Sequence, residues 1–139
     1  LYGEQGMKEK MELFSQMDET QQLKETEKSG RELADRFGLK SIVITGVDVV
    51  CGDGSVKMGN LVIEENEADW YFSIKEGGSY SGTGDLFASV LSAGMVKGIS
   101  MKECVQKAIA FLARAIHDAV LEGTDRNDGV CFEKYLKML

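Results

Sequence analysis

Residues 77–85 read Gly77-Gly78-Ser79-Tyr80-Ser81-Gly82-Thr83-Gly84-Asp85, a glycine-rich loop that ends in an acid. A β-forming segment precedes this loop, and apolar residues recur at helical spacing directly after it. Such a loop between a strand and a helix favours anion binding, because the first turn of a helix has free backbone N–H groups and glycines let a phosphate approach them closely. The stretch therefore predicts a phosphate-binding turn in an α/β protein.

Asp85 is the most informative residue of this loop, and two interpretations of it stay open. An Asp at the start of a helix often serves only as a cap. An acid beside a phosphate site would repel the phosphate, unless the acid faces an acceptor hydroxyl and takes its proton while the amides stabilise the transferring phosphoryl group. Two other nucleotide motifs are excluded: Phe87 stands where the dinucleotide fingerprint needs a third glycine, and no Gly-Lys-Ser/Thr closes a Walker A loop.

The segment before the loop predicts a helix followed by strands. Asp18 and Gln21 form a capping-box pattern at the start of a polar helix, and Gly38 is placed to end it. Leu23, Leu33, Ala34 and Phe37 recur on one face of this helix and are its expected apolar contacts.

Three strands are expected between this helix and the loop. Residues 41–45 are apolar and β-branched, which is typical of a short buried strand. Residues 52–54, Gly-Asp-Gly, indicate a hairpin turn. Residues 56–63 and 69–75 then predict a meander of antiparallel strands, so that the whole pattern favours an α/β layered fold.

The chain after the loop predicts helices. The first follows the loop and ends at Gly98; Ser100 and Glu103 form a capping-box pattern for the second, which ends near Gly123. Residues 132–139 predict a last short helix.

Length and composition narrow the class of protein. The 139 residues fit one domain. The net charge of −7 argues against a nucleic-acid surface and against docking on anionic membranes, and no segment approaches the ~20 apolar residues of a membrane helix. Three cysteines without a C-x-x-C pair indicate reduced thiols in the cytoplasm. The single histidine, His117, gives no zinc spacing, so no metal ligand is predicted.

Residues 82–88, Gly-Thr-Gly-Asp-Leu-Phe-Ala, resemble the Gly-[Ala/Thr]-Gly-Asp signature of the ribokinase-like superfamily, in the form found in pyridoxal and pyridoxamine kinases. Residues 42–47 resemble the strand of that family that ends at the nucleotide phosphates, and the meander lies between that strand and the loop, as in the family. The tail from Asn127 to Val130, leading to residues 132–136, is similar to the tails of bacterial pyridoxal kinases.

The resemblance implies a three-layer α/β/α fold, here with a partial sheet that contains a β-meander and is followed by C-terminal helices. It implies ATP-dependent phosphorylation of the 5′-hydroxymethyl group of pyridoxal, pyridoxamine or pyridoxine, with Mg²⁺, in a cytoplasmic homodimer. Asp85 would be the catalytic base, Gly82, Thr83 and Gly84 the anion hole for the γ-phosphate, and Thr45 a contact to the ATP phosphates. Thr45 can equally be a strand-end residue that satisfies the backbone.

The resemblance covers nearly all of this chain but only about half of a family member. We therefore expect residues 1–139 to be the C-terminal part of a single kinase domain, with an exposed apolar edge. Two alternatives stay open. One is a related kinase for a sugar or for hydroxymethylpyrimidine, although sugar kinases usually carry Ala at the position of Thr83 and pyrimidine kinases tend to carry Cys at that of Asp85. The other is an inactive fragment.

Overall fold

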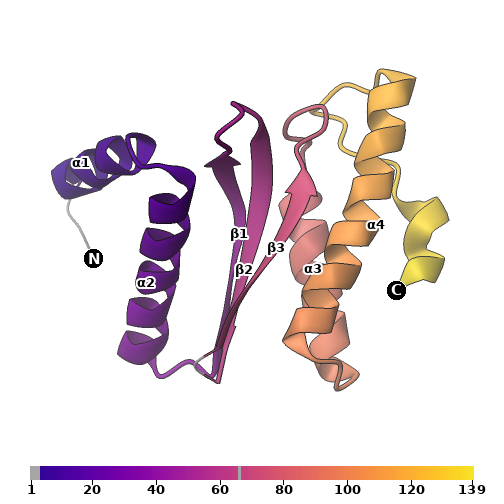
Figure 1. Ribbon diagram of the computed structural model, residues 1–139. Helices are drawn as coiled ribbons and strands as arrows, with labels where there is room; N and C mark the ends of the chain where they lie inside the picture. Colours follow the sequence, from indigo (N-terminus) through magenta and orange to yellow (C-terminus); the bar gives the residue numbers. More distant parts are fainter. Residues whose placement is uncertain (1–3, 66) are drawn as a thin grey trace.

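The computed structural model describes residues 4–65 and 67–139, and it has three layers (Figure 1). Helix α2 lies on one side of a small sheet, and α3 and α4 lie on the other (Figure 1). This arrangement confirms the predicted three-layer α/β/α fold. The elements in chain order are α1 (Glu4–Ser15), α2 (Glu19–Phe37), β1 (Ser41–Val50), β2 (Val56–Glu64), β3 (Glu67–Ile74), α3 (Thr83–Val96), α4 (Met101–Glu122) and the 3₁₀-helix η1 (Glu133–Met138).

The sheet is an antiparallel meander in the order β1-β2-β3, as the sequence predicted for its last two strands. Residues 41–45 do not form a short buried strand, and that expectation was wrong. The strand β1 continues to Val50, and Val49 is its one fully buried residue. A bulge interrupts its pairing with β2 between Ile44 and Val47, and Gly46 at φ 70° supplies the left-handed backbone there. Because β1 lies at an edge of the three strands, its side chains are less covered than those of the central strand.

The structure confirms the helix caps that the sequence predicted from neighbouring residues. The Asp18 carboxylate accepts a hydrogen bond from the Gln21 amide at 2.9 Å, and the Gln21 side chain accepts one from the Asp18 amide at 3.1 Å. Gly38 ends α2 in the left-handed conformation. Ser100 accepts a bond from the Glu103 amide at the start of α4. The last segment is a 3₁₀-helix rather than an α-helix.

Helix α2 contacts the sheet through small and polar residues. Gln22, Thr26 and Gly30, spaced four residues apart, are buried, whereas the predicted contact Phe37 is 60% exposed. A Cβ on Gly30 would lie 2.6 Å from Cδ1 of Ile63, so the missing side chain lets the helix approach the strand. The other predicted contacts, Leu23, Leu33 and Ala34, are half-buried, so only Phe37 departs from the prediction, and the closest approach is made by the small residue between them.

The principal core lies between the sheet and the pair α3–α4. Val62 of β2 packs there against apolar side chains of both helices, including Phe87, Val105 and Phe111. This layer fixes the direction of α3, and with it the position of the glycine-rich loop at the end of β3 (Figure 1).

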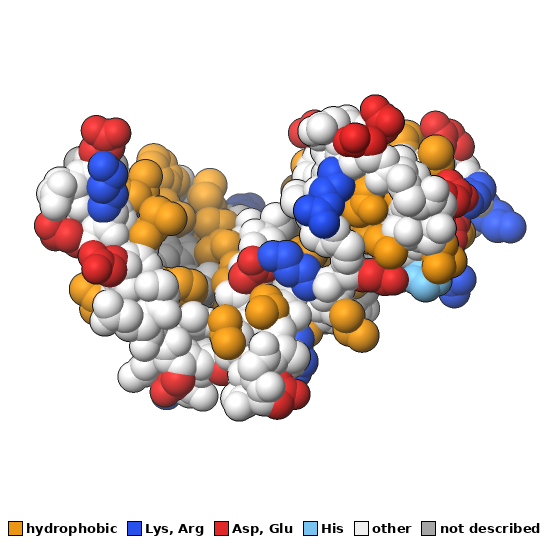
Figure 2. All heavy atoms as spheres, turned by 90° about the horizontal axis from the view of Figure 1, so that it is seen from above, with side chains coloured by type: hydrophobic (Ala, Val, Ile, Leu, Met, Phe, Trp, Pro, Cys, Tyr) orange, Lys and Arg blue, Asp and Glu red, His pale blue; other side chains and the backbone are white. Residues whose placement is uncertain are grey.

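Apolar side chains also remain exposed on α1 and on the outer strands, as expected for an apolar edge. Met11 of α1 is 68% exposed, and Ile74 at the end of β3 is 86% exposed. Figure 2 shows hydrophobic side chains along the α1–α2 side of a hollow that separates this part from the part built by α3 and α4. Among the described residues, no helix has the length and apolar character needed to cross a membrane.

Candidate functional site

The glycine-rich loop connects the end of β3 to the start of α3, where the sequence placed the anion site. Gly77, Gly78 and Gly82 have φ values of 66°, 92° and 79°, a left-handed conformation that L side chains rarely adopt. Gly82 is the N-cap residue of α3, and no side chain caps this end of the helix. The buried ring of Tyr80, 6% exposed, anchors the middle of the loop.

The first turn of α3 presents free donors. The Leu86 amide bonds the Gly82 carbonyl at 3.0 Å and closes the first turn. The amides of Gly82, Gly84 and Asp85 donate to no partner within residues 4–65 and 67–139. These N–H groups and the positive end of the helix dipole together favour an anion at this point.

Thr83 differs from its two glycine neighbours because its hydroxyl and its amide are both directed to the Tyr80 carbonyl. Its hydroxyl donates to the Tyr80 carbonyl at 2.9 Å, and its amide makes a long contact of 3.5 Å with the same oxygen. Thr83 therefore fixes the turn that holds the free amides of Gly82 and Gly84, and its hydroxyl oxygen still has room to accept a bond.

Asp85 is the third residue of α3, and its side chain is exposed. In the described part of the chain its carboxylate accepts no hydrogen bond and forms no ion pair, so Asp85 does not cap the helix. An unpaired carboxylate next to free amides of the same turn combines an acceptor for protons with donors for an anion. The cap interpretation, left open by the sequence, is not realised.

A second loop, residues 123–132, packs against the first one. The Ser81 amide donates to the Arg126 carbonyl at 2.9 Å, and a Cβ on Gly129 would lie 3.0 Å from the Ser81 carbonyl oxygen. The guanidinium of Arg126 covers Gly78. The sequence reasoning missed Arg126, and the one signal near it was the glycine at position 129, whose φ is 80°.

Helix α4 also holds the loop. His117 of α4 pairs with Glu76, the residue that leads into the loop, with 2.9 Å between Nδ1 and Oε1. The single histidine is thus an exposed contact between α4 and the loop, which agrees with an ordinary helix position.

The structure does not bring Thr45 into contact with this loop. Thr45 lies at the bulge of β1 and is exposed, and β2 separates its strand from β3. Thr45 forms no hydrogen bond with any described residue of the loop.

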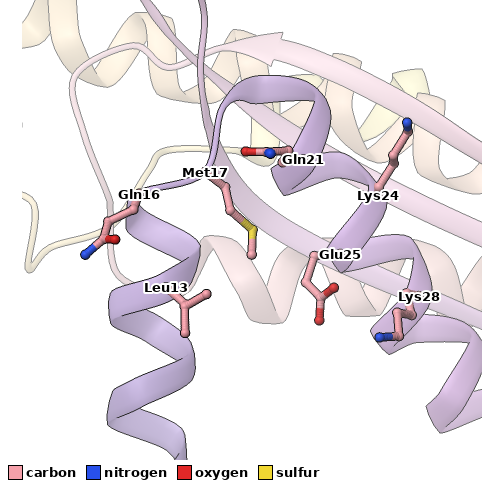
Figure 3. A pocket seen from close by; sticks show the side chains of 7 residues that line it. All are labelled: Leu13, Gln16, Met17, Gln21, Lys24, Glu25 and Lys28. Carbon is pink, nitrogen blue, oxygen red and sulfur yellow. The ribbon is translucent and has the colours of Figure 1, made fainter.

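A pocket of about 480 Å³ lies elsewhere, between α1 and α2 (Figure 3). It is open to solvent and combines apolar with charged side chains. Its lining residues are Leu13, Gln16, Met17, Gln21, Lys24, Glu25 and Lys28. None of the predicted site residues contributes to it.

The family of the chain follows from comparison with known proteins. The profile described as "Phosphomethylpyrimidine kinase" matches residues 7–129. The chain belongs to the phosphomethylpyrimidine kinase family. The matched range contains both the glycine-rich loop and Gly129, and this agrees with the predicted ribokinase-like membership.

Two solved kinase structures are similar to this family member. One, from Bacteroides thetaiotaomicron VPI-5482, has a provisional assignment as a phosphomethylpyrimidine kinase; it is 25% identical, with a TM-score of 0.71, over 81% of this chain and 38% of that chain. The other is pyridoxal kinase from Lactobacillus plantarum, 25% identical with a TM-score of 0.58, over 70% of this chain and 34% of that chain. This chain thus spans little more than a third of either kinase. No curated protein gives a significant match.

Proposed function

We propose that this chain supplies the phosphate-binding loop and the catalytic base of an ATP-dependent kinase that phosphorylates the 5′-hydroxymethyl group of pyridoxal, pyridoxamine or pyridoxine. The observation that carries the proposal is the unpaired carboxylate of Asp85 on the same helical turn as free amides. Membership of the phosphomethylpyrimidine kinase family and likeness to a pyridoxal kinase support it.

The residues of the first turn of α3 divide the chemistry between them. The Asp85 carboxylate accepts the proton of the substrate hydroxyl as its oxygen attacks the γ-phosphorus of ATP. The amides of Gly82 and Gly84 stabilise the negative charge of the transferring phosphoryl group, because they are fixed donors without another partner. Thr83 holds the turn through Tyr80. The bond between the γ-phosphorus and the bridging oxygen of ATP breaks, and ADP leaves.

The described residues fit the phosphates of ATP better than they fit a metal ion. The loop offers free amides and left-handed glycines, which are the features of a phosphate cradle. No group of three His, Cys, Asp or Glu side chains within residues 4–65 and 67–139 is placed to hold a metal. We assign no step to Mg²⁺ for that reason. Thr45 remains a proposed contact to the ATP phosphates from the sheet.

We also propose that residues 1–139 are the C-terminal part of a single kinase domain. The share of the two related kinases that the chain spans, 38% and 34%, supports this division. Substrate binding then depends on residues outside this chain.

Hydroxymethylpyrimidine is the second candidate substrate. The name of the family and the Bacteroides structure favour it. It presents the same chemistry to Asp85, namely a hydroxymethyl group on an aromatic ring. The Asp at position 85 favours the vitamin B6 compounds, because the loop resembles that of pyridoxal kinases and pyrimidine kinases tend to carry Cys at this position.

The test compares substrates in the complete kinase. Phosphate transfer from ATP is measured by ADP release with pyridoxal, pyridoxamine, pyridoxine, hydroxymethylpyrimidine and ribose, and the 139-residue chain is assayed beside it. We expect the highest kcat/KM with a vitamin B6 compound and little activity from the 139-residue chain alone. A higher kcat/KM with hydroxymethylpyrimidine would select the second candidate, and no transfer to any acceptor would refute the kinase assignment.

A further inference from the structure

Arg126 lies in an unusual position for a charged surface residue. A Cβ built on Gly78 would lie 3.0 Å from Cζ and Nη1 of Arg126 and 3.2 Å from Nη2. Three guanidinium atoms at nearly equal distances mean that the planar group lies flat over the glycine. The bare backbone of Gly78, at φ 92°, is what makes room for it.

The backbone of Arg126 is fixed to the proposed phosphate site. Its carbonyl accepts the bond from the Ser81 amide at 2.9 Å, directly before Gly82. The turn that carries Arg126 is closed by Asp125, whose carboxylate accepts from the Asn127 amide at 2.8 Å. The guanidinium is therefore presented by a short, hydrogen-bonded turn and not by a free tail.

The charge of Arg126 is not neutralised. The residue is exposed and forms no ion pair with any side chain in the described part of the chain. Glu76, the acid directly before the loop, is paired with His117 instead, and Asp85 at the end of the loop forms no ion pair with a described residue. Lys75, at the end of β3, is likewise paired, with Asp48. In a chain of net charge −7, Arg126 thus places a positive charge beside the glycine-rich loop that no acidic side chain of residues 4–65 and 67–139 pairs.

We propose that Arg126 is a nucleotide-binding residue, whose guanidinium contacts the phosphate chain of ATP on the side of the loop remote from Asp85. The proposal rests on the function proposed above. A guanidinium is suited to this role, because it is always charged and can donate two parallel hydrogen bonds to one phosphate. The amides of α3 would hold the transferring phosphate, and Arg126 would hold the part of the nucleotide that stays with ADP.

The assignment of Arg126 to the phosphates that stay in ADP predicts which kinetic constant changes when its side chain is replaced. Contact with the phosphates that remain in ADP is made before and during transfer, so its loss weakens nucleotide binding more than it slows the chemical step. A purely structural role, in which Arg126 only covers Gly78, would instead lower thermal stability and disturb all kinetic constants together.

The experiment uses the complete kinase and three variants. Arg126→Gln removes the charge and keeps a hydrogen-bonding side chain, Arg126→Lys keeps the charge, and Arg114→Gln is the matched control, which removes one exposed charge from α4. We measure ADP affinity by calorimetry, KM for ATP, KM for the acceptor and the unfolding temperature. We expect Arg126→Gln to weaken ADP binding and raise the KM for ATP by about 10-fold, Arg126→Lys by less, and Arg114→Gln to leave both unchanged.

The outcomes separate the two proposals. Unchanged ADP affinity in Arg126→Gln would overturn the role of Arg126, and so would an equal loss in Arg114→Gln or a loss accompanied by a lowered unfolding temperature. If the wild-type protein binds ADP but transfers no phosphate, the proposed function fails, and calorimetry alone still decides the role of Arg126. A smaller salt dependence of ADP affinity in Arg126→Gln than in the wild type would support a contact between charges.

Discussion

Replacing Asp85 by Asn tests the proposed base most directly. Asn is nearly isosteric, and it keeps the hydrogen-bonding capacity of the side chain but cannot take a proton as a carboxylate does. Loss of a general base lowers turnover by about 10²–10⁴-fold. At about 1.36 kcal/mol for each tenfold change, this corresponds to a barrier higher by about 2.7–5.4 kcal/mol.

The effect of the same substitution on stability should be much smaller. The Asp85 carboxylate makes no hydrogen bond or ion pair with any described residue, so Asn loses only the favourable interaction of the negative charge with the first turn of α3. That interaction contributes about 0.3–1 kcal/mol at an exposed position. We therefore expect turnover to fall by orders of magnitude while the unfolding temperature falls by about 1–4 °C.

Asp18→Ala is the matched control, because Asp18 caps α2 and its carboxylate accepts a hydrogen bond from the Gln21 amide at 2.9 Å. Its loss should cost about 1 kcal/mol of stability and leave turnover unchanged. Both variants are assayed in the complete kinase, by ADP release in the presence of acceptor and by thermal unfolding. If Asp85→Asn turned over like the wild type, the carboxylate would have no catalytic part, and the reasoning from its unpaired state would be refuted.

Two further predictions concern packing and pH. Gly94→Ala should lower the free energy of unfolding by about 1–3 kcal/mol, because the new Cβ would lie 2.2 Å from Sγ of Cys104. In urea denaturation, adding Cys104→Ala should recover part of this loss. Strictly additive effects of the two substitutions would contradict the steric cause. Hydrogen bonds from Lys134 and Tyr135 lower the pKa of Asp118 below its usual 3.8, so the stabilisation they give is present above that pH and is lost as pH falls through the folded-state pKa. In acid titrations Asp118→Asn should therefore lose stability less steeply below about pH 4 than the wild type. Identical slopes would count against the interaction of Asp118 with Lys134 and Tyr135.

Local signals in the sequence predicted the elements that depend on neighbouring residues. The capping box of Asp18 and Gln21, the left-handed Gly38 and the hairpin turn before Val56 were all recognised from short patterns, and the structure confirms them. The glycine-rich loop was recognised in the same way, because its acid and its glycines are adjacent in the chain.

Contacts between segments far apart in the chain could not be predicted from short sequence patterns. A strand at the edge of a sheet and one at the centre can have the same composition, so the apolar pattern of residues 41–45 does not show that their strand lies at an edge. In α2 the decisive residue is Gly30, whose missing side chain allows a close approach that no hydrophobic pattern marks. Arg126 reaches Gly78 across 48 positions of sequence, and only the packing of the two loops shows it.

The bulge of β1 interrupts the regular alternation of side chains between the two faces of the strand. Ile44 lies opposite Leu61 and Val47 lies opposite Gly59, so two side chains three positions apart point to the same face. The extra residue of β1 is therefore absorbed by the bulge: removing Gly46 would restore ordinary alternation and leave Val47 and Asp48, which pairs with Lys75, on their present faces. A deletion between Val47 and Val50 has no such compensation, because it would turn the remaining side chains of the strand to the opposite face.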